Sequence, residues 1–229
     1  MSEGKEALKR LAAEAAVEYV RDGQVVGLGT GSTARYVILA LGERVRAGLK
    51  LTGVPTSQET ADLAARAGIP LLSGDDAWSI DVAIDGADQV DPKLNLIKGG
   101  GGALLREKIV AASARQFIVV VDHTKRVPIL GDSFPLPIEV VPFGWQNTAH
   151  WIEEVGGKTV LRQRGGQVFR TELGHYILDL EIPKIEDPAW LEARLDQIPG
   201  VVETGLFVGR TDILIVGTPR GVEIQKTTR

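Results

Sequence analysis

Short apolar runs alternate with amphipathic stretches through the first 122 residues, and this alternation limits the fold more than any other feature. Residues 5–20 carry apolar side chains at helical spacing, and the Asp22-Gly23 pair ends that pattern. The apolar run 25–28 then leads through a glycine-rich turn into a second helical stretch, 34–45. The order strand, turn, helix is typical of proteins with a parallel sheet.

The same unit recurs further along the chain. We expect strands at 51–56, 69–73, 79–85, 94–98 and 116–122, and helices at 57–68 and 103–114. The strands at 79–85 and 116–122 contain the apolar runs 82–84 and 117–121, which are typical of strands buried on both faces. The sequence therefore predicts an α/β fold, with a mainly parallel, Rossmann-like sheet covered by helices on both faces.

A cluster of prolines, Pro128, Pro135, Pro137 and Pro142, marks an expected domain boundary. After it come a helix at 143–156, strands at 158–164 and 175–182, a helix at 188–198 and a strand at 200–208, an order typical of a small α+β, ferredoxin-like domain. We expect a large domain over 1–130, the small domain over 131–207, and a C-terminal segment, 208–229, that returns to the large domain.

Composition excludes several classes of function. The formal charge of −4 and the dispersed basic residues argue against a nucleic-acid partner. Cysteine is absent, which removes disulfides, thiolate nucleophiles and Cys-ligated metal sites. There is no apolar run long enough to span a bilayer, and the N-terminal segment is a charged amphipathic helix and not a signal peptide. We expect a cytoplasmic protein without a membrane partner.

Three polar, glycine-rich clusters each follow a predicted strand, and ligands of open α/β sheets bind beyond the carboxyl ends of the strands. The first cluster is Thr30-Gly31-Ser32-Thr33, at a strand-to-helix turn. Free backbone N–H groups, hydroxyls and the positive end of the helix favour a phosphate there. A helix N-cap is an equally good interpretation of these residues. A dinucleotide motif is excluded because Ala34 stands where its third glycine would be.

The second cluster, Asp85-Gly86-Ala87-Asp88, places two carboxylates after a buried strand. They are candidates for a functional site, with solvated loop acids as the alternative. A calcium loop would need further oxygen ligands at alternate positions, and Asp91 and Asn95 do not complete that spacing. We therefore expect no metal.

The third cluster is a run of one lysine and four glycines, Lys98-Gly99-Gly100-Gly101-Gly102, directly before a helix that bears Glu107 in its expected second turn. Between a strand and a helix, close approach of the backbone to a ligand explains the glycines better than a bare flexible loop does. From position alone, Glu107 fits a solvated surface as well as catalysis. Lys125 follows the strand 116–122, and a solvated loop lysine is its ordinary interpretation.

These clusters closely resemble type A ribose-5-phosphate isomerases. The motifs GTGST, IDGAD, KGGGGALLREK and DHTK stand in the family's order and context, as do VPTS, LPIEVVPF and IPGVVETGLF. The resemblance covers nearly the whole chain. Gly102 is one departure, a conservative choice among small residues.

The resemblance implies a role for each matching position. Thr30, Gly31, Ser32 and Thr33 form a substrate-binding turn, and Asp85 and Asp88 contact the sugar. Lys98 is a polar or cationic stabilising group. Glu107 carries the proton, and Lys125 contacts the substrate. The implied substrate-binding set also includes Gly86, Ala87, Gly99, Gly100 and Gly101, and Lys9 is an additional candidate. The resemblance leaves open which of these groups contacts phosphate.

The implied activity is the interconversion of ribose 5-phosphate and ribulose 5-phosphate in the non-oxidative pentose phosphate pathway. Such an exchange needs a base for carbon and a group that stabilises an enediolate oxygen, and it needs no redox cofactor. Two rival functions are a non-catalytic sugar-phosphate sensor and an acyl or CoA transferase with Glu107 as nucleophile. Because dimers are the commonest soluble assemblies, we expect a symmetric homodimer.

Overall fold

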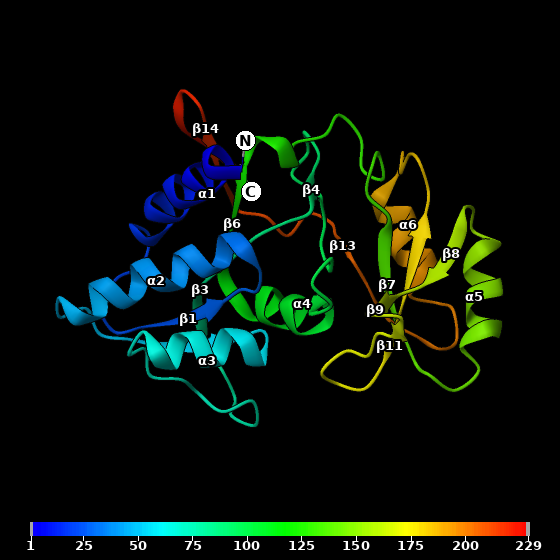
Figure 1. Ribbon diagram of the computed structural model, residues 1–229, viewed down its shortest axis with the longest axis horizontal. Helices are drawn as coiled ribbons and strands as arrows, with labels where there is room; N and C mark the ends of the chain where they lie inside the picture. Colours follow the sequence, from blue (N-terminus) through cyan, green and yellow to red (C-terminus); the bar gives the residue numbers. More distant parts are fainter. Residues whose placement is uncertain (1, 228–229) are drawn as a thin grey trace. The chain divides into compact units, whose positions relative to one another are not determined.

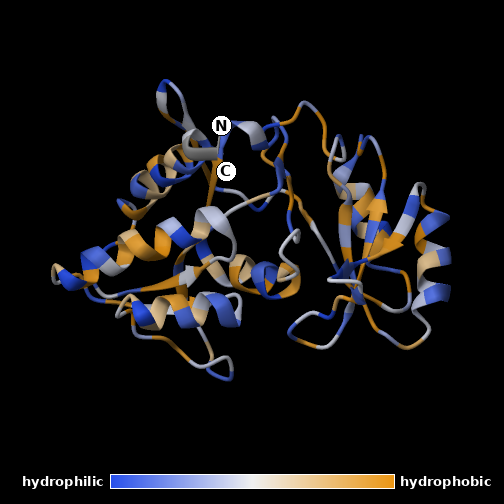
Figure 2. Ribbon diagram, viewed as in Figure 1, coloured by the Kyte–Doolittle hydropathy of each residue, from blue (hydrophilic) through white to orange (hydrophobic). Residues whose placement is uncertain are grey.

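The computed structural model describes residues 2–227, which form two compact units. Unit 1 contains the residues up to Ala87, Arg106–Lys125 and the residues from Arg210 onward, and unit 2 contains Asp88–Leu105 and Arg126–Gly209. The chain therefore passes between the units four times. Figure 1 shows the helices and strands of each unit, and Figure 2 shows that apolar residues concentrate on the strands of both.

Unit 1 is built around a six-stranded sheet in the order β15-β14-β6-β3-β1-β2. The five strands from β14 to β2 pair in parallel, and β15 joins the edge antiparallel to β14. The elements are α1 (Ser2–Val17), β1 (Gln24–Leu28), α2 (Ser32–Arg46), β2 (Leu51–Pro55), α3 (Gln58–Arg66), β3 (Ile80–Asp85), α4 (Leu104–Ser113), β6 (Ala114–Asp122), the 3-10 helix η1 (His123–Lys125), β14 (Ile213–Thr218) and β15 (Gly221–Lys226).

Successive side chains of each strand point to opposite faces of the sheet, and helices pack on both faces. Val26 and Leu28 of β1 belong to one buried cluster with residues of α1, α2 and α3. Gly27 faces the opposite side, where a side-chain carbon would meet Val110 of α4. Helices therefore cover both faces, which confirms the predicted α/β fold.

Unit 2 contains a four-stranded antiparallel sheet in the order β12-β7-β11-β8. Its elements are β7 (Leu136–Val140), α5 (Trp145–Glu153), β8 (Lys158–Leu161), β11 (Tyr176–Glu181), α6 (Pro188–Leu195) and β12 (Val201–Thr204). Strand, helix, strand, strand, helix, strand in this order is the ferredoxin-like arrangement. A buried apolar cluster that includes Ile138, Ile152, Leu178 and Leu191 joins both helices to the sheet.

Two smaller sheets complete unit 2. The strands β4 (Gln89–Val90), β5 (Leu96–Ile97) and β13 (Leu206–Phe207) form one, and the short hairpin of β9 (Gln163–Arg164) and β10 (Gln167–Val168) is the other. Because β5 pairs with β13, residues 88–105 cluster with unit 2. We had expected this segment in the large domain, 1–130.

Several predicted strands differ from the structure. The strand expected at 158–164 is broken at Arg162 into β8 and β9, which belong to different sheets. Residues 69–73 make only an isolated bridge, between Gly53 and Leu71. Pro70 and Pro55 lack the N–H groups that a longer ladder would need. The single strand expected at 200–208 is broken at Gly205 into β12 and β13, which belong to different sheets.

Candidate active site

The turn Thr30–Thr33 of unit 1 is held by its neighbours through both backbone and side chain. Thr30 N donates to Asp85 Oδ1 at 3.1 Å. The Thr30 hydroxyl lies in a cluster of four hydroxyls, with Thr56 Oγ1 at 2.7 Å, Ser57 Oγ at 2.8 Å and Thr60 Oγ1 at 3.1 Å. Thr60 Oγ1 donates in turn to the carbonyl of Gly29. This cluster fixes the turn from the side of β2 and α3.

The start of α2 shows how this turn meets the helix. The N-cap of α2 is Gly31, with φ 104°, and no side chain caps the helix there. The cluster therefore contains the N-cap residue, Gly31, while Ser32 and Thr33 follow inside the first turn of the helix and do not cap it. An uncapped helix start presents backbone N–H groups and a positive dipole end, which is the arrangement that binds phosphates.

Asp85 ends β3 and is buried, with 3% of its surface exposed. Its Oδ1 accepts from Gly86 N at 2.7 Å as well as from Thr30 N. A side-chain carbon on Gly29 would overlap this carboxylate, so only glycine fits there. Asp85 therefore connects the first two glycine-rich clusters, and the interpretation of Asp85 as a solvated loop acid is wrong.

Glu107 lies in the first turn of α4, because the helix begins at Leu104 and not earlier. We had expected it in the second turn. The carboxyl group sits near the positive end of the helix, where a negative charge is favoured. Only 6% of the residue is exposed. Burial rules out the interpretation of Glu107 as a solvated surface residue.

Lys125 is half-buried at the end of η1, which Asp122 holds in place. Asp122 Oδ1 accepts from Thr124 N at 2.9 Å and from the Thr124 hydroxyl. Burial raises the pKa of Asp122, but the Thr124 hydrogen bonds and the nearby charges of Lys125 and Lys5 more than offset it, so the pKa lies below its ordinary value.

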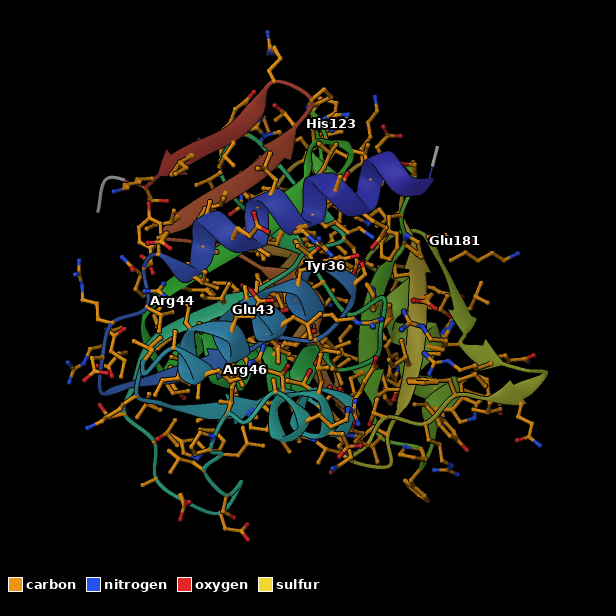
Figure 3. All side chains as sticks on the ribbon, turned by 60° about the vertical axis from the view of Figure 1, so that its left-hand side comes forward. Tyr36, Glu43, Arg44, Arg46, His123 and Glu181 are labelled. Atoms are coloured by element: carbon orange, nitrogen blue, oxygen red, sulfur yellow. The ribbon has the colours of Figure 1, made fainter. Side chains whose placement is uncertain are left out.

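Lys9 of α1 belongs to a further polar group in unit 1. Its Nζ lies 2.6 Å from Glu6 Oε1, and Tyr36 of α2 donates to the other Glu6 oxygen at 2.8 Å. Figure 3 shows Tyr36 on α2 next to α1. The bonds from Lys9 and Tyr36 lower the pKa of Glu6, and the bond to Glu6 raises the pKa of Tyr36.

In unit 2, Asp88 and Lys98 are joined to the backbone of their own surroundings. Asp88 Oδ2 accepts from Gly100 N at 2.8 Å, so this carboxylate holds the tetraglycine loop, Gly99–Gly102. Lys98 N donates to Gly205 O at 2.8 Å, and its Nζ lies 5.5 Å from the centre of the Phe207 ring. Lys98 is 2% exposed. Burial of an ammonium group costs free energy unless nearby groups compensate its charge. Lys98 therefore differs from an ordinary solvent-exposed lysine.

The tetraglycine loop is more constrained than its sequence indicates. Gly99 and Gly102 have positive φ, 102° and 92°. A side-chain carbon on Gly102 would collide with the Phe169 ring. The fourth glycine is therefore required by its conformation and its neighbour, and is not a free choice among small residues. Defined contacts at Gly100 and Gly102 favour one conformation of this segment over a bare flexible loop.

Some residues of these arrangements had no signal in the sequence. Thr56, Ser57 and Thr60 stand in a predicted turn and helix start, and Ser57 is indeed the N-cap of α3. Their common contact with Thr30 depends on the pairing of β1 with β2, which no local pattern reveals. Arg162 and Asp179 of unit 2, which bond to each other, likewise had no local signal in the sequence. Their contact depends on the pairing of β8 with β11.

No helix within residues 2–227 combines the length and apolar character needed to cross a membrane. In the part of the chain that the structure describes, no three His, Cys, Asp or Glu side chains gather as the ligands of a metal ion would.

Comparison with known proteins decides the family. The family model of ribose 5-phosphate isomerase A (phosphoriboisomerase A) matches residues 52–221. The ribose-5-phosphate isomerase A of Thermomicrobium roseum is 49% identical over 228 residues, which are 99% of this chain and 96% of the relative. This chain belongs to the ribose 5-phosphate isomerase A family. It is therefore an isomerase.

Further members of the family agree with this assignment. The ribose-5-phosphate isomerase A of Gloeobacter violaceus is 54% identical over 218 residues, with 95% of each chain covered. The solved structure of ribose 5-phosphate isomerase A from Methanocaldococcus jannaschii has a TM-score of 0.93 and 42% identity over 97% of this chain and 99% of that one. A structure of D-ribose-5-phosphate isomerase in complex with phospho-erythronic acid has a TM-score of 0.94, with 43% identity and the same coverage.

Proposed function

We propose that this chain interconverts ribose 5-phosphate and ribulose 5-phosphate through an enediolate, as a step of the non-oxidative pentose phosphate pathway. Membership of the ribose 5-phosphate isomerase A family over nearly the full chain carries this proposal. The reaction moves one hydrogen from C2 to C1 and exchanges the oxidation states of these carbons. The substrate neither gains nor loses hydrogen or electrons overall, so the proposal requires no redox cofactor.

Glu107 is the proposed base. Its carboxylate takes the C2 proton of the open-chain aldose, the C–H electrons form the C1=C2 double bond, and the C1 oxygen gains negative charge. A proton then moves from the C2 hydroxyl to the C1 oxygen, the carbonyl re-forms at C2, and Glu107 returns its proton to C1, which gives the ketose. Burial of Glu107 supports this role, because a carboxyl group shielded from water exchanges its proton less readily with solvent between the two transfers.

Lys98 is the proposed group that opposes the enediolate charge. A buried ammonium acts in a low-dielectric environment, where its attraction for an oxyanion is stronger than in water. Transition-state stabilisation predicts that Lys98→Ala lowers kcat more than it raises KM.

The remaining roles follow from the same arrangements. The turn Thr30–Thr33 binds phosphate through the uncapped start of α2, and Lys9 and Lys125 add positive charge. Asp85 moves hydroxyl protons during ring opening and Asp88 orients the sugar.

Phospho-erythronic acid offers a probe of the enediolate step. A related isomerase has been solved in complex with it. It is a four-carbon acid phosphate, and its carboxylate places negative charge on two oxygens near the end of the chain, as an enediolate does. We expect it to compete with ribose 5-phosphate in this chain and to bind less well to Lys98→Ala.

The direct test is NMR of the purified, EDTA-treated protein with ribose 5-phosphate in D₂O. We expect ribulose 5-phosphate to form, with some solvent deuterium at the exchanging carbon. Glu107→Gln should lose about 10²–10⁴-fold in kcat and keep much of its substrate affinity. The matched control is Glu43→Gln, an exposed glutamate of α2 (Figure 3), which should keep full activity.

Each other outcome has a definite meaning. Substrate binding without conversion would indicate a sensor, and neither binding nor conversion would mean that the substrate is wrong. Near-normal kcat in Glu107→Gln would exclude Glu107 as the base.

Two further expectations stay predictions. A symmetric homodimer would have twice the 24.6 kDa of one chain, which light scattering on an eluting peak measures. The cytoplasmic location expected from the sequence likewise stays a prediction.

A further inference from the structure

Arg162 of unit 2 makes a direct contact with the tetraglycine loop. Its Nη1 donates to the carbonyl of Gly99 at 2.7 Å and to that of Gly100 at 3.3 Å. The Gly99 carbonyl also accepts from Gly102 N at 3.0 Å inside the loop, and the bonds from Arg162 add a contact from outside the loop. A guanidinium group that satisfies two adjacent carbonyls therefore constrains the path of the loop.

Asp179 holds that guanidinium in one orientation. Arg162 Nε donates to Asp179 Oδ2 at 2.8 Å, and Nη2 donates to Oδ1, so the pair is bidentate. The two side chains are only 12% and 17% exposed. Asp179 lies in β11 opposite Val160 of β8, and Arg162 follows β8 directly. The planar guanidinium of Arg162 is thus held in one orientation by the sheet and bonds to the loop in that orientation.

A second contact comes from the other end of the same hairpin. Phe169 N donates to Arg162 O at 2.9 Å, which closes the hairpin of β9 and β10. The Phe169 ring fills the space where a side chain on Gly102 would be, and the Arg164 guanidinium lies 4.5 Å from the centre of that ring. The hairpin therefore contacts the first and the last glycine of the loop.

We propose that Arg162, oriented by Asp179, is a positioning residue that fixes the tetraglycine loop and, through it, Lys98. Glycine loses more conformational freedom on folding than any other residue, so four in a row need external restraint to hold one geometry. Asp88 restrains the loop at Gly100 N, and Gly205 restrains Lys98 N. Arg162 supplies the restraint on the carbonyl side. This inference rests on the proposed function, in which Lys98 stabilises the enediolate.

The test is the kinetics of Arg162→Ala on ribose 5-phosphate. A misplacement of about 1 Å costs about 100-fold, so we expect kcat to fall about 10–100-fold while KM changes far less. Guanidinium chloride at about 50 mM, far below the molar concentrations that unfold proteins, should restore part of the lost kcat. A role confined to stability would not respond in this way, because guanidinium only destabilises the fold.

Two further variants keep the test decisive if Arg162→Ala folds poorly. Arg162→Lys keeps the charge without the planar fork, and Asp179→Asn keeps two hydrogen-bonding groups without the charge. Both should lower kcat less than Arg162→Ala, in the same direction, at a temperature well below their unfolding midpoints.

The matched control is Arg170→Ala in the same unit. Arg170 Nη1 also donates to a glycine carbonyl, that of Gly174 at 3.0 Å, in a loop without predicted site residues. We expect Arg170→Ala to keep kcat within about twofold.

The outcomes separate the inference from the proposed function. An inactive wild-type protein would refute the function. An active wild type with unchanged kcat in folded Arg162 variants, or a loss that follows thermal stability and shows no guanidinium rescue, would refute the positioning role.

Discussion

At the residue scale, the polar side chains of the predicted site also hold the backbone around them. Asp85 Oδ1 accepts from Thr30 N and Gly86 N, and Asp88 Oδ2 accepts from Gly100 N. A carboxylate that fixes a turn through one oxygen presents the other in a defined position. Substitution at such a residue therefore changes structure and chemistry together, and the choice of replacement decides which effect is measured.

Asp85 allows these two effects to be separated. Asp85→Asn keeps a carbonyl oxygen that can accept from Thr30 N and Gly86 N, so we expect a near-normal melting temperature and a large loss of kcat. Asp85→Ala leaves buried N–H groups without an acceptor, which costs about 1–3 kcal/mol per group. Thermal unfolding and steady-state kinetics of both variants measure the difference. Full activity in Asp85→Asn would show that its charge has no part in the reaction.

Asp122 should contribute a pH-dependent part of the stability. Its pKa is lowered in the folded protein, so the unfolded state binds the proton more readily. The stabilisation is present above the unfolded pKa of about 4 and is lost as the pH falls through the lower folded value. We expect the difference in melting temperature between wild type and Asp122→Asn to be largest near neutral pH and to shrink at pH about 3.

A companion variant tests the cause of that shift. Thr124→Ala removes one of the two Thr124 hydrogen bonds to Asp122, so the folded pKa should lie closer to its ordinary value. The acid loss of stability should then be smaller than in wild type and end at a higher pH. A constant difference between wild type and Asp122→Asn across the pH range would contradict a lowered pKa.

The sequence pointed to candidate site residues and revealed little of their surroundings. Glycine and acid clusters after apolar strands pointed to Thr30, Asp85 and Lys98 because strand ends are a local pattern. The burial of Glu107 depends on packing around α4, and the contact of Arg162 with Gly99 joins residues 63 positions apart. Neither the burial nor the contact can be predicted from the spacing of residues that are close in sequence.

At the element scale, the tetraglycine loop shows how a segment without side chains acquires one conformation. Gly102 has φ 92° and faces the Phe169 ring, whereas Gly101 lies outside the left-handed region and has open space around its Cα. The two neighbouring glycines therefore differ in what they tolerate. Their contrast gives a prediction with an internal control.

Gly102→Ala should destabilise the protein by about 1–3 kcal/mol, because alanine is strained at positive φ and its methyl group displaces Phe169. Gly101→Ala should change the free energy of unfolding by no more than about 0.5 kcal/mol. Urea denaturation of both variants measures this. Equal effects at the two positions would show that the loop is flexible in solution.

The accuracy of the strand predictions also has a physical explanation. Long apolar runs such as 79–85 and 116–122 became β3 and β6, since burial on both faces leaves a strong local pattern. The hairpin β9–β10 is exposed and has no such pattern. The division of 200–208 at Gly205 depends on close backbone approach, with Gly205 N donating to Pro137 O at 2.7 Å and Lys98 N donating to Gly205 O. A tertiary contact determined that break.

At the scale of the whole molecule, the predicted site motifs coincide with the places where the chain passes from one unit to the other. The passages lie between Ala87 and Asp88, between Leu105 and Arg106, between Lys125 and Arg126, and between Gly209 and Arg210. The first three fall within or directly after IDGAD, KGGGGALLREK and DHTK. Each unit therefore depends on segments that are distant in sequence.

This dependence predicts the effect of C-terminal truncation. All six residues of β14 are buried, and the strand pairs with β6 on one side and β15 on the other. A chain ending at Gly209 loses both strands and leaves β6 as an exposed, apolar edge, so we expect no cooperative thermal unfolding and a tendency to aggregate. A chain ending at Thr218 keeps β14 and loses only the half-exposed edge strand β15, and it should fold with a lowered melting temperature. Circular dichroism during heating distinguishes the two. Cooperative unfolding of the shorter chain near the wild-type temperature would show that unit 1 does not need its last two strands.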